Sequence, residues 1–314
     1  MKKIIIKTLV FITIFVTIFI FASRILMRKG NGYGSDILAF YHEPKNSIDL
    51  IFFGSSHSYA TFNPTIIETE TGLNSFNFAT QQQPLWISYY YMNEALKYQN
   101  PEYFVLEILM TSVDDEYASE GVNRDAIDKM RFSLNKIKAI NASVKDFDER
   151  FSYYFNIIKY HDRWNSLDKT DILNLLSEYR QPSKGYTYLP KGNTPIKKVD
   201  LSNYKERKNL SKKNSLYLNK IIDLTRDNNI KLILVKSPTE NSEQKQAYYN
   251  EVKKIALEKN IDFLDYNMIY NEVGIDFNED FFDTGHLDTN GAKKVSKHFS
   301  NYLKMVMNEK GEIK

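Results

Sequence analysis

IFFGSSHSYATF, residues 51–62, joins an apolar run to a cluster of small and polar residues. Apart from Asp49, IDLIFF (48–53) has the apolar character of a strand that is buried on both faces of a parallel sheet. Gly54 ends the run, and two serines and a histidine follow it. Such a cluster is typical of a plain turn, but it is also where a nucleophile stands at the mouth of an α/β sheet. The rest of the chain has to decide between the two.

Four further segments have the character of strands: LNSFNF (73–78), YFVLEIL (103–109), NIKLILVKSP (229–238) and NIDFLDY (260–266). LWISYYYMNEALKY (85–98) carries apolar residues at helical spacing, and a second helical stretch, QKQAYYNEVKKIALEK (244–259), separates the last two strands. Strands that alternate with helices predict an α/β fold, here a five-stranded parallel sheet with helices on both faces.

Residues 115–215 interrupt this alternation and are rich in Tyr, Lys, Asp and Asn. A connection of about a hundred residues is too long for a compact sheet domain. RFSYYFNIIKYHDRWNSL (150–167) and KTDILNLLSEY (169–179) read as helical, and a less regular stretch follows at 181–200. We therefore expect a mostly helical cap subdomain, inserted into a catalytic domain formed by residues 48–114 and 216–314.

The N-terminus contains an uncharged run, TLVFITIFVTIFIFAS (8–23), with basic residues on both sides. These cations are Lys2, Lys3, Lys7, Arg24, Arg28 and Lys29. At 1.5 Å per residue the run spans about 24 Å, and counting from Ile4, with the Lys7 side chain reaching the interface, brings it close to the ~30 Å of a hydrocarbon core.

We expect an N-terminal transmembrane helix that serves as a single-span anchor over residues 1–29, followed by a Gly-rich linker at 30–47. A short basic N-terminus usually stays inside, so the large domain would lie outside the cytoplasm. A cleaved signal peptide is the competing interpretation, although the small-residue cleavage site is poor.

Composition excludes several kinds of chemistry. The chain of 314 residues has no cysteine, so disulfides, thiolate catalysis and cysteine-based zinc sites are excluded. The formal charge of +3 becomes −3 without the six cations beside the apolar run, so the basic charge indicates a membrane rather than nucleic acid. The five histidines lie far apart in sequence, and we expect no metal and no cofactor.

A second polar cluster, FFDTGHLDTNGAKKVSKHFSNYL (281–303), lies near the other end of the chain. Its later part predicts a helix, because Ala292, Val295, Phe299, Leu303 and Val306 fall on one face. Asp283 and His286 then occupy the loop before that helix, where a parallel sheet delivers residues to its active edge. An Asp that orients an imidazole and a His that removes a serine proton are what nucleophilic serine chemistry requires.

These two clusters resemble the first and last sequence blocks of the SGNH, or GDSL-like, hydrolases. GSSHS (54–58) is similar to the block in which a serine follows Gly-Asp/Asn/Ser at the end of the first strand. DTGHLDTNGA (283–292) is similar to the final block, Asp-x-x-His followed by a helix. The resemblance implies a flavodoxin-like three-layer fold with Ser56 as the nucleophile, His286 as the general base and Asp283 as its orienting acid.

The middle blocks of that family match less well. NFATQQ (77–82) lies where the family has an oxyanion-hole Gly, and Gln82 stands at the matching position. Where the family has an oxyanion-hole Asn, VLEILMTS (105–112) places Thr111, with Glu107 four residues before it. Gln82 and Thr111 are therefore the candidate oxyanion or substrate residues, and a backbone N–H could serve in place of a side chain.

Other residues near the first block have alternative interpretations. Ser55 is the rival nucleophile, and Ser58 is a weaker one. His57 is interpreted as a structural residue or part of the pocket wall, in contact with substrate, rather than as a second base.

KYHDRW (159–164) has two interpretations as well. His161 and Arg163 could line the cap and face an anionic or sugar ligand. The favoured alternative is a helix with exposed polar groups and a packed Trp164.

Three features narrow the resemblance to one group within this family. They are the N-terminal anchor, the sequence GSSH in place of GDS, and the long insertion. Together they are similar to membrane-anchored SGNH proteins that assist alginate O-acetylation and teichoic-acid D-alanylation. This implies a serine O-acyltransferase or esterase, with a membrane-bound O-acyltransferase as partner and a polysaccharide or cell-wall polymer as acceptor. The alternative is a catalytically silent scaffold that binds the acyltransferase and its polymer. Phosphate-ester chemistry is a third possibility, but no Gly-rich phosphate loop or acidic metal cluster supports it.

Overall fold

The computed structural model describes residues 1–27, 33–113, 115–116, 119–169, 171, 181–192 and 196–309. Its centre is a five-stranded sheet in the order β2-β1-β3-β4-β5, and every neighbouring pair of strands is parallel. The strands are β1 (Leu50–Phe53), β2 (Ser75–Asn77), β3 (Tyr103–Glu107), β4 (Lys231–Lys236) and β5 (Asp262–Asp265). All five lie within the segments that the sequence predicts, so the parallel α/β fold is confirmed.

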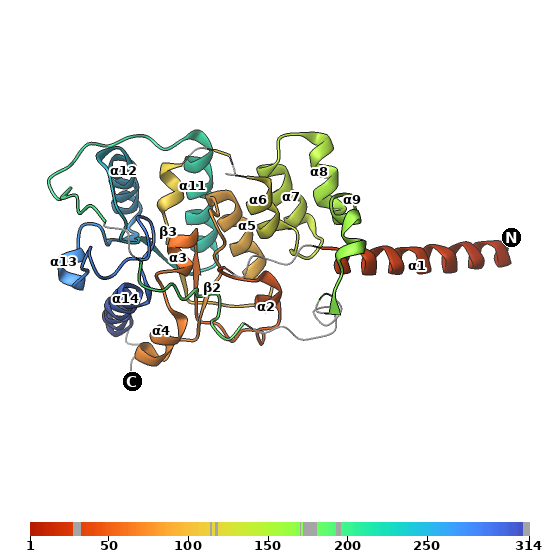
Figure 1. Cartoon of the computed structure of the whole chain (residues 1–314), viewed down its shortest axis with the longest axis horizontal. Coiled ribbons are helices and arrows are strands. Elements are labelled where there is room, and N and C mark those ends of the chain that lie inside the picture. The colour runs from red at the N-terminus through yellow and green to blue at the C-terminus, as the bar shows by residue number, and fades with distance from the viewer. Residues whose placement is uncertain are drawn as a thin grey trace.

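Helices cover both faces of the sheet (Figure 1). One face is covered by α2 (Ile37–Tyr41), α5 (Leu85–Ala95), α11 (Lys212–Asp227) and α12 (Glu243–Lys259). The other face is covered by α4 (Pro64–Thr71), α13 (Tyr270–Val273) and α14 (Thr289–Glu309). Two short elements, α3 (Ser56–Tyr59) and the 3-10 helix η1 (Leu109–Ser112), follow β1 and β3 directly.

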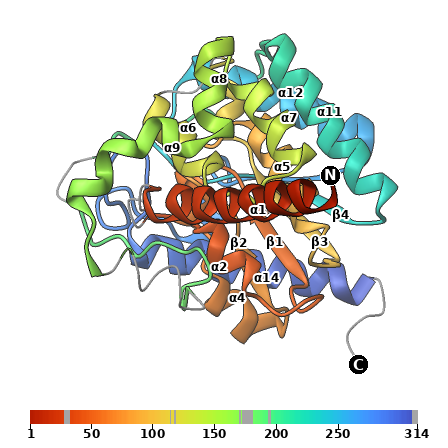
Figure 2. The ribbon, with the colours of Figure 1, turned by 90° about the vertical axis from the view of Figure 1, so that its right-hand side faces the viewer.

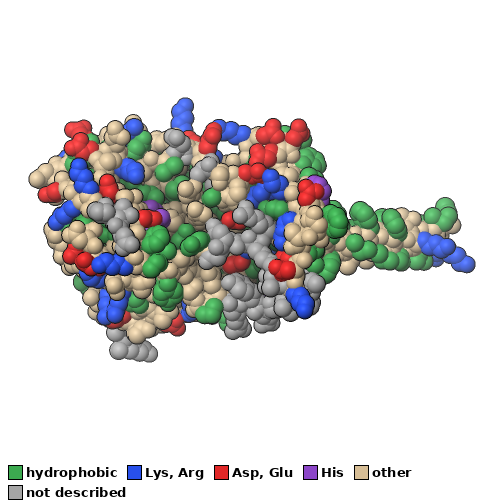
Figure 3. Space-filling model, viewed as in Figure 1, with side chains coloured by type: hydrophobic (Ala, Val, Ile, Leu, Met, Phe, Trp, Pro, Cys, Tyr) green, Lys and Arg blue, Asp and Glu red, His purple; other side chains and the backbone are tan. Residues whose placement is uncertain are grey.

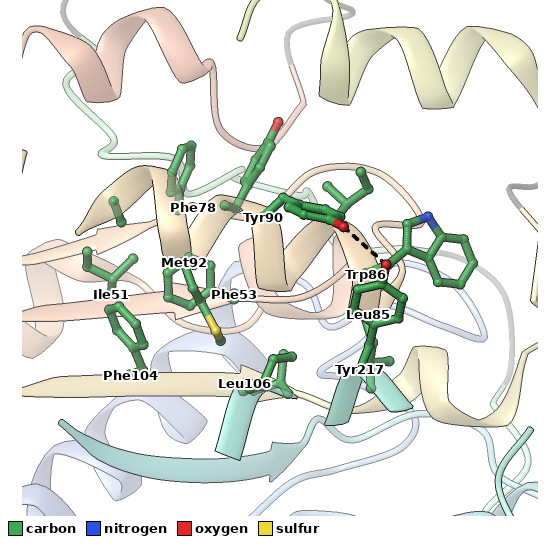
Figure 4. Close-up of a cluster of buried hydrophobic side chains, with 14 of the residues drawn as sticks. Ile51, Phe53, Phe78, Leu85, Trp86, Tyr90, Met92, Phe104, Leu106 and Tyr217 are labelled. Carbon is green, nitrogen blue, oxygen red and sulfur yellow. Dashed lines mark hydrogen bonds between the residues drawn. The ribbon is translucent and has the colours of Figure 1, made fainter. Parts of the chain in front are cut away.

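The core follows from the alternation of side chains along each buried strand. In β1, Ile51 and Phe53 pack into the layer that contains α5 and α11, whereas Leu50 and Phe52 pack against α14. Figure 4 shows the first of these layers, in which aromatic and aliphatic side chains from β1, β3, α5 and α11 interlock. Apolar residues on both faces of β1 therefore fix its place in the middle of the molecule.

Among the described residues of the insertion are five short helical elements. They are α6 (Glu120–Ile127), α7 (Leu134–Ser143), α8 (Phe147–Tyr154), α9 (Asn156–Tyr160) and the 3-10 helix η2 (His161–Ser166). The helical stretch predicted over 150–167 therefore breaks at Phe155, whose backbone is not helical (φ −127°, ψ 83°). The helix predicted at 169–179 lies almost entirely outside the described residues. No helix or strand occupies the described parts of 181–200, as expected.

Helix α1 (Lys2–Ile25) projects from the domain beside α9 (Figure 1). Its length and composition allow it to cross a membrane, and none of its residues is buried. Figure 2 looks at the side from which α1 leaves and shows α6, α7, α8 and α9 on that side. Of the basic residues that flank the apolar run, Arg28 and Lys29 lie outside the described residues.

Candidate active site

The strand order of the sheet reverses beside β1. From β1 the chain continues to β2 on one side of it and then crosses to β3 on the other side. Ligands of open parallel sheets bind at such a switch point, beyond the carboxyl ends of the strands. Ser56 begins α3 there, three residues after the last residue of β1.

Gly54 makes the exit from β1 possible. Its φ of +136° is unfavourable for any residue with a side chain, and a Cβ there would lie 2.9 Å from Glu107 Cβ and 3.0 Å from Glu107 O. The end of β1 therefore passes directly against the end of β3. Ser55 then accepts a hydrogen bond from the His57 N–H at 3.4 Å and so caps α3.

The loop before α14 holds an imidazole in a fixed orientation. Asp283 Oδ1 accepts hydrogen bonds from the backbone N–H groups of Gly285 and His286, both at 2.8 Å. The His286 ring lies against the same carboxylate, with Nδ1 2.8 Å from Oδ1 and 3.0 Å from Oδ2. Because a carboxylate can only accept, Nδ1 carries the proton when the imidazole is neutral.

The two distant segments meet at Ser56. Its Oγ lies 2.8 Å from His286 Nε2, although 230 residues separate them in the chain. With Nδ1 protonated, Nε2 is the acceptor, and the Ser56 hydroxyl donates to it. The separation lies within the ~2.6–3.2 Å that direct proton transfer requires. Ser58 is fully buried and donates to Asn77 Oδ1 at 3.1 Å, so of these serines it is Ser56 that faces the imidazole.

His57 lies beside this arrangement as a second, buried imidazole. Its ring centroid is 4.9 Å from that of His286, and its Nδ1 has no hydrogen-bond partner among the described residues. Burial lowers the pKa of His57, and the nearby charge of Lys236 lowers it further. His57 is therefore a neutral wall residue without a carboxylate to orient it.

A buried ion pair lies at the ends of β3 and β4, next to the segment that carries Ser56. Glu107 and Lys236, at the ends of β3 and β4, are 3.6 Å apart and wholly buried. Burial raises the pKa of Glu107 and lowers that of Lys236, and the charge of each partner opposes the shift of the other. The Ser237 N–H donates to Glu107 Oε1 at 3.4 Å, and its hydroxyl donates to His57 O at 2.9 Å. These bonds connect the strand ends to the segment that carries Ser56.

The two predicted oxyanion residues, Gln82 and Thr111, have different surroundings. Gln82 is exposed and has a left-handed backbone, with φ +46°. The Thr111 hydroxyl is buried and donates to Ile108 O at 2.8 Å. Neither side chain hydrogen-bonds to Ser56 or His286 in the described part of the chain. The Thr111 hydroxyl is therefore engaged with the backbone of its own turn.

The sequence reasoning did not single out Tyr59. It lies one helical turn after Ser56 in α3, and residues three apart share a helix face. Burial raises the pKa of the Tyr59 hydroxyl. Within SSHSY (55–59), the spacing of three residues between Ser56 and Tyr59 could have indicated that the two share a helix face. That signal was hidden because α3 is only four residues long.

Two of the KYHDRW residues have clear surroundings. Arg163 donates to Leu26 O at 2.8 Å and to Met27 O at 2.5 Å, at the end of α1. Its guanidinium therefore binds protein backbone. Trp164 is 71% exposed, so the prediction that it is packed is wrong.

No group of three or more His, Asp or Glu side chains that could hold a metal ion is found within the described ranges.

A protein-family model matches residues 183–308, a range that includes β4, β5, α14 and the loop of Asp283 and His286. No curated protein matches the sequence.

Several solved structures are similar to this chain at low sequence identity. One is a G-D-S-L family lipolytic protein from Desulfitobacterium hafniense, with 11% identity, a TM-score of 0.41, and coverage of 82% of this chain and 99% of that chain. A GDSL-like lipase from Bacteroides thetaiotaomicron has 10% identity, a TM-score of 0.37, and coverage of 84% and 89%. An acetyl xylan esterase from Butyrivibrio proteoclasticus has 13% identity, a TM-score of 0.35, and coverage of 86% and 66%. Similarities this distant do not assign a substrate.

Proposed function

We propose that this chain is a membrane-anchored, extracytoplasmic serine esterase or O-acyltransferase of the SGNH type. It acts on acyl groups, acetyl above all, of a cell-envelope or secreted polysaccharide. The observation that carries the proposal is the continuous hydrogen-bonded path from Ser56 Oγ through the imidazole of His286 to the carboxylate of Asp283. A hydroxyl, an imidazole and a carboxylate in this order form an activated nucleophile.

The reaction proceeds in two balanced steps. Ser56 Oγ attacks the acyl carbonyl while its proton passes to His286 Nε2, and Asp283 stabilises the resulting imidazolium through Nδ1–H. The tetrahedral intermediate collapses, the C–O bond to the leaving group breaks, and His286 returns the proton to the departing oxygen. A sugar hydroxyl or water then attacks the acyl-serine and gives its proton to His286. The C–O bond between the acyl group and Ser56 Oγ breaks, and His286 returns the proton to Ser56 Oγ.

The oxyanion needs donors that are not engaged elsewhere. The Ser56 N–H has no hydrogen-bond partner within the described part of the chain and belongs to the same residue as the nucleophile. We assign it as one oxyanion donor, a role that backbone N–H groups commonly fill and that is worth about 3–4 kcal/mol per donor.

The acyl group would reach Ser56 from the membrane side. Helix α1 would hold the domain at the outer surface, with the N-terminus inside. In that arrangement a membrane-bound O-acyltransferase supplies the acyl group, and a polysaccharide or cell-wall polymer accepts it.

A catalytically silent scaffold for the same partners is the second candidate. The observation that favours it is that the Thr111 hydroxyl, a candidate oxyanion donor, already donates to Ile108 O.

An active-site serine probe, such as a fluorophosphonate, separates the two candidates. The full chain in detergent should be labelled, Ser56→Ala should not be labelled, and Ser55→Ala should retain labelling. Equal labelling of wild type and Ser56→Ala would reject the enzyme and leave the scaffold. Isotope-labelled acyl donors offered together with an oligosaccharide acceptor would then distinguish transfer from hydrolysis.

A further inference from the structure

We infer that the insertion forms a second membrane contact: residues 147–166, which contain α8, α9 and η2, rest on the bilayer surface beside α1. This inference depends on the proposed anchoring of α1 in the membrane. It assigns the insertion the role of fixing how the catalytic domain sits on the lipid surface.

A continuous row of aromatic rings runs from α1 onto the insertion. Along α1, the ring centroids of Phe11 and Phe15 are 6.4 Å apart, and those of Phe15 and Phe19 are 6.3 Å apart. Phe19 then meets Phe155 edge to face at 6.0 Å, where α8 ends. Phe155 lies 6.2 Å from Phe151, which continues the row along α8 to Phe147, a further 5.6 Å away.

The insertion end of this row is exposed. Five large apolar side chains there expose between 40% and 71% of their surface: Phe147, Phe151, Phe155, Ile158 and Trp164. The rings of Phe147, Phe151 and Phe155 contact one another in turn. An exposed apolar surface of this kind marks an interaction site. Aromatic side chains, and Trp above all, favour the depth of lipid headgroups.

The bilayer is the occupant that fits this patch, because the patch continues the surface of α1. None of the residues of α1 is buried, and only a few near its end, Phe19 among them, are partly covered. Many hydrophobic side chains lie along the face seen in Figure 3, with basic residues near its free end. Figure 1 shows α8 and α9 at the end of the domain from which α1 leaves. A bilayer that surrounds α1 therefore reaches the patch without any further partner.

Hydrogen bonds hold the end of α1 against the insertion. Arg163 donates to Leu26 O and Met27 O at 2.8 and 2.5 Å, where the helix has unpaired carbonyl groups. The same guanidinium donates to Asp171 at 3.1 Å, and Asn156 Nδ2 lies 3.3 Å from Met27 Sδ. These contacts place Trp164, the residue after Arg163, close to the point where the chain leaves the membrane.

The charge of the segment excludes simple attraction to anionic lipid. Residues 147–166 contain three basic and three acidic residues, so their formal charges cancel. Contact is therefore driven by burial of apolar surface rather than by headgroup charge. It should be equally strong on neutral and anionic bilayers.

Tryptophan fluorescence tests the inference, because the chain has two tryptophans in opposite environments. Trp86 is fully buried and donates to Ser143, whereas Trp164 is exposed. The full chain is placed in phosphatidylcholine nanodiscs whose lipids carry bromine at carbons 6 and 7, a quencher close to the headgroups. We expect Trp164 to be quenched by the bromolipid by about half and to be shielded from aqueous iodide. Emission of Trp164→Phe, which retains Trp86, should respond to neither quencher.

A third variant separates failure of this inference from failure of the anchor. Phe15→Trp, in a chain that also carries Trp86→Phe and Trp164→Phe, reports whether α1 is in the bilayer. If this probe is quenched but Trp164 is not, the second contact is wrong and the anchor stands. If neither is quenched, the anchoring itself is wrong, and the inference with it. If Trp86→Phe does not fold, Phe15→Trp is introduced into the Trp164→Phe chain, and its fluorescence is compared with that of Trp164→Phe alone. The Trp164 signal is then the fluorescence of the wild type minus that of Trp164→Phe.

Discussion

At the scale of single residues, two neighbouring imidazoles have opposite surroundings. His286 is partly exposed, contacts Ser56 through Nε2 and is held by Asp283 through Nδ1. His57 is buried, has an unpartnered Nδ1, and has its pKa lowered by burial. Groups whose environments differ in this way take different roles in acid–base chemistry. His286 is suited to exchange a proton, and His57 to remain neutral.

Replacing each histidine in turn tests this division of roles. His286→Gln should reduce the rate of acyl-enzyme formation by about 10³–10⁴-fold, because no base remains to accept the Ser56 proton. His57→Gln should reduce it by less than about tenfold, because that side chain only shapes the wall. Because burial lowers the pKa of His57, the acid limb of the pH–rate profile should be unchanged in His57→Gln. A shifted or absent acid limb in that variant would assign His57 the role of the base.

The sequence allowed Ser56, Asp283 and His286 to be selected because each lies in a recognisable setting, at a strand exit or before a long helix. Gln82 and Thr111 had no such setting. Thr111 lies in the four-residue 3-10 helix η1, and sequence periodicity does not predict the direction of its hydroxyl in so short an element. Sequence spacing therefore predicts residues fixed by regular elements better than residues fixed by single turns.

At the scale of elements, buried apolar runs predicted the strands well but overestimated their lengths. LNSFNF became a three-residue strand, because only Ser75 to Asn77 pair with β1. Apolar character continues into flanking residues that pack without joining the ladder. The helical stretch at 150–167 shows the opposite difficulty. Its apolar residues serve several surfaces, and Phe155 turns toward α1. A helix that breaks for a tertiary contact leaves no local signal.

A substitution at Gly54 tests the close packing of the end of β1 against the end of β3. Gly54→Ala should lower the free energy of unfolding by about 1–3 kcal/mol, through backbone strain and collision with Glu107. It should also slow labelling of Ser56, because α3 begins two residues later. Gly72→Ala is the matched control, since its φ of +77° is also left-handed but nothing lies within 4 Å of the added Cβ.

Chemical denaturation and probe labelling of both variants measure the two effects. Gly72→Ala should lose about 1 kcal/mol at most and label at the wild-type rate. If the two variants behaved alike, close packing of β1 against β3 would not be what requires the glycine.

At the scale of the whole molecule, the domain is joined to α1 by more than the linker. Arg163 binds the carbonyl groups that end the helix, and Phe155 packs against Phe19 inside it. A cleaved signal peptide would take these contacts with it and leave the Arg163 guanidinium with Asp171 alone. These contacts favour an α1 that remains part of the chain and packs against the insertion.

Arg163 should therefore control how firmly α1 is held. The natural chain has no cysteine, so spin labels can be placed at two introduced cysteines, Ile12→Cys in α1 and Leu257→Cys in α12. In nanodiscs, Arg163→Gln should broaden the distance distribution between the labels, because each lost charged hydrogen bond costs about 1.5–3 kcal/mol. Lys159→Gln is the control, since Lys159 lies on the same segment but pairs with Glu120 at the surface. A distribution in Arg163→Gln that overlays those of the control and the parent would show that the aromatic contacts alone fix the helix.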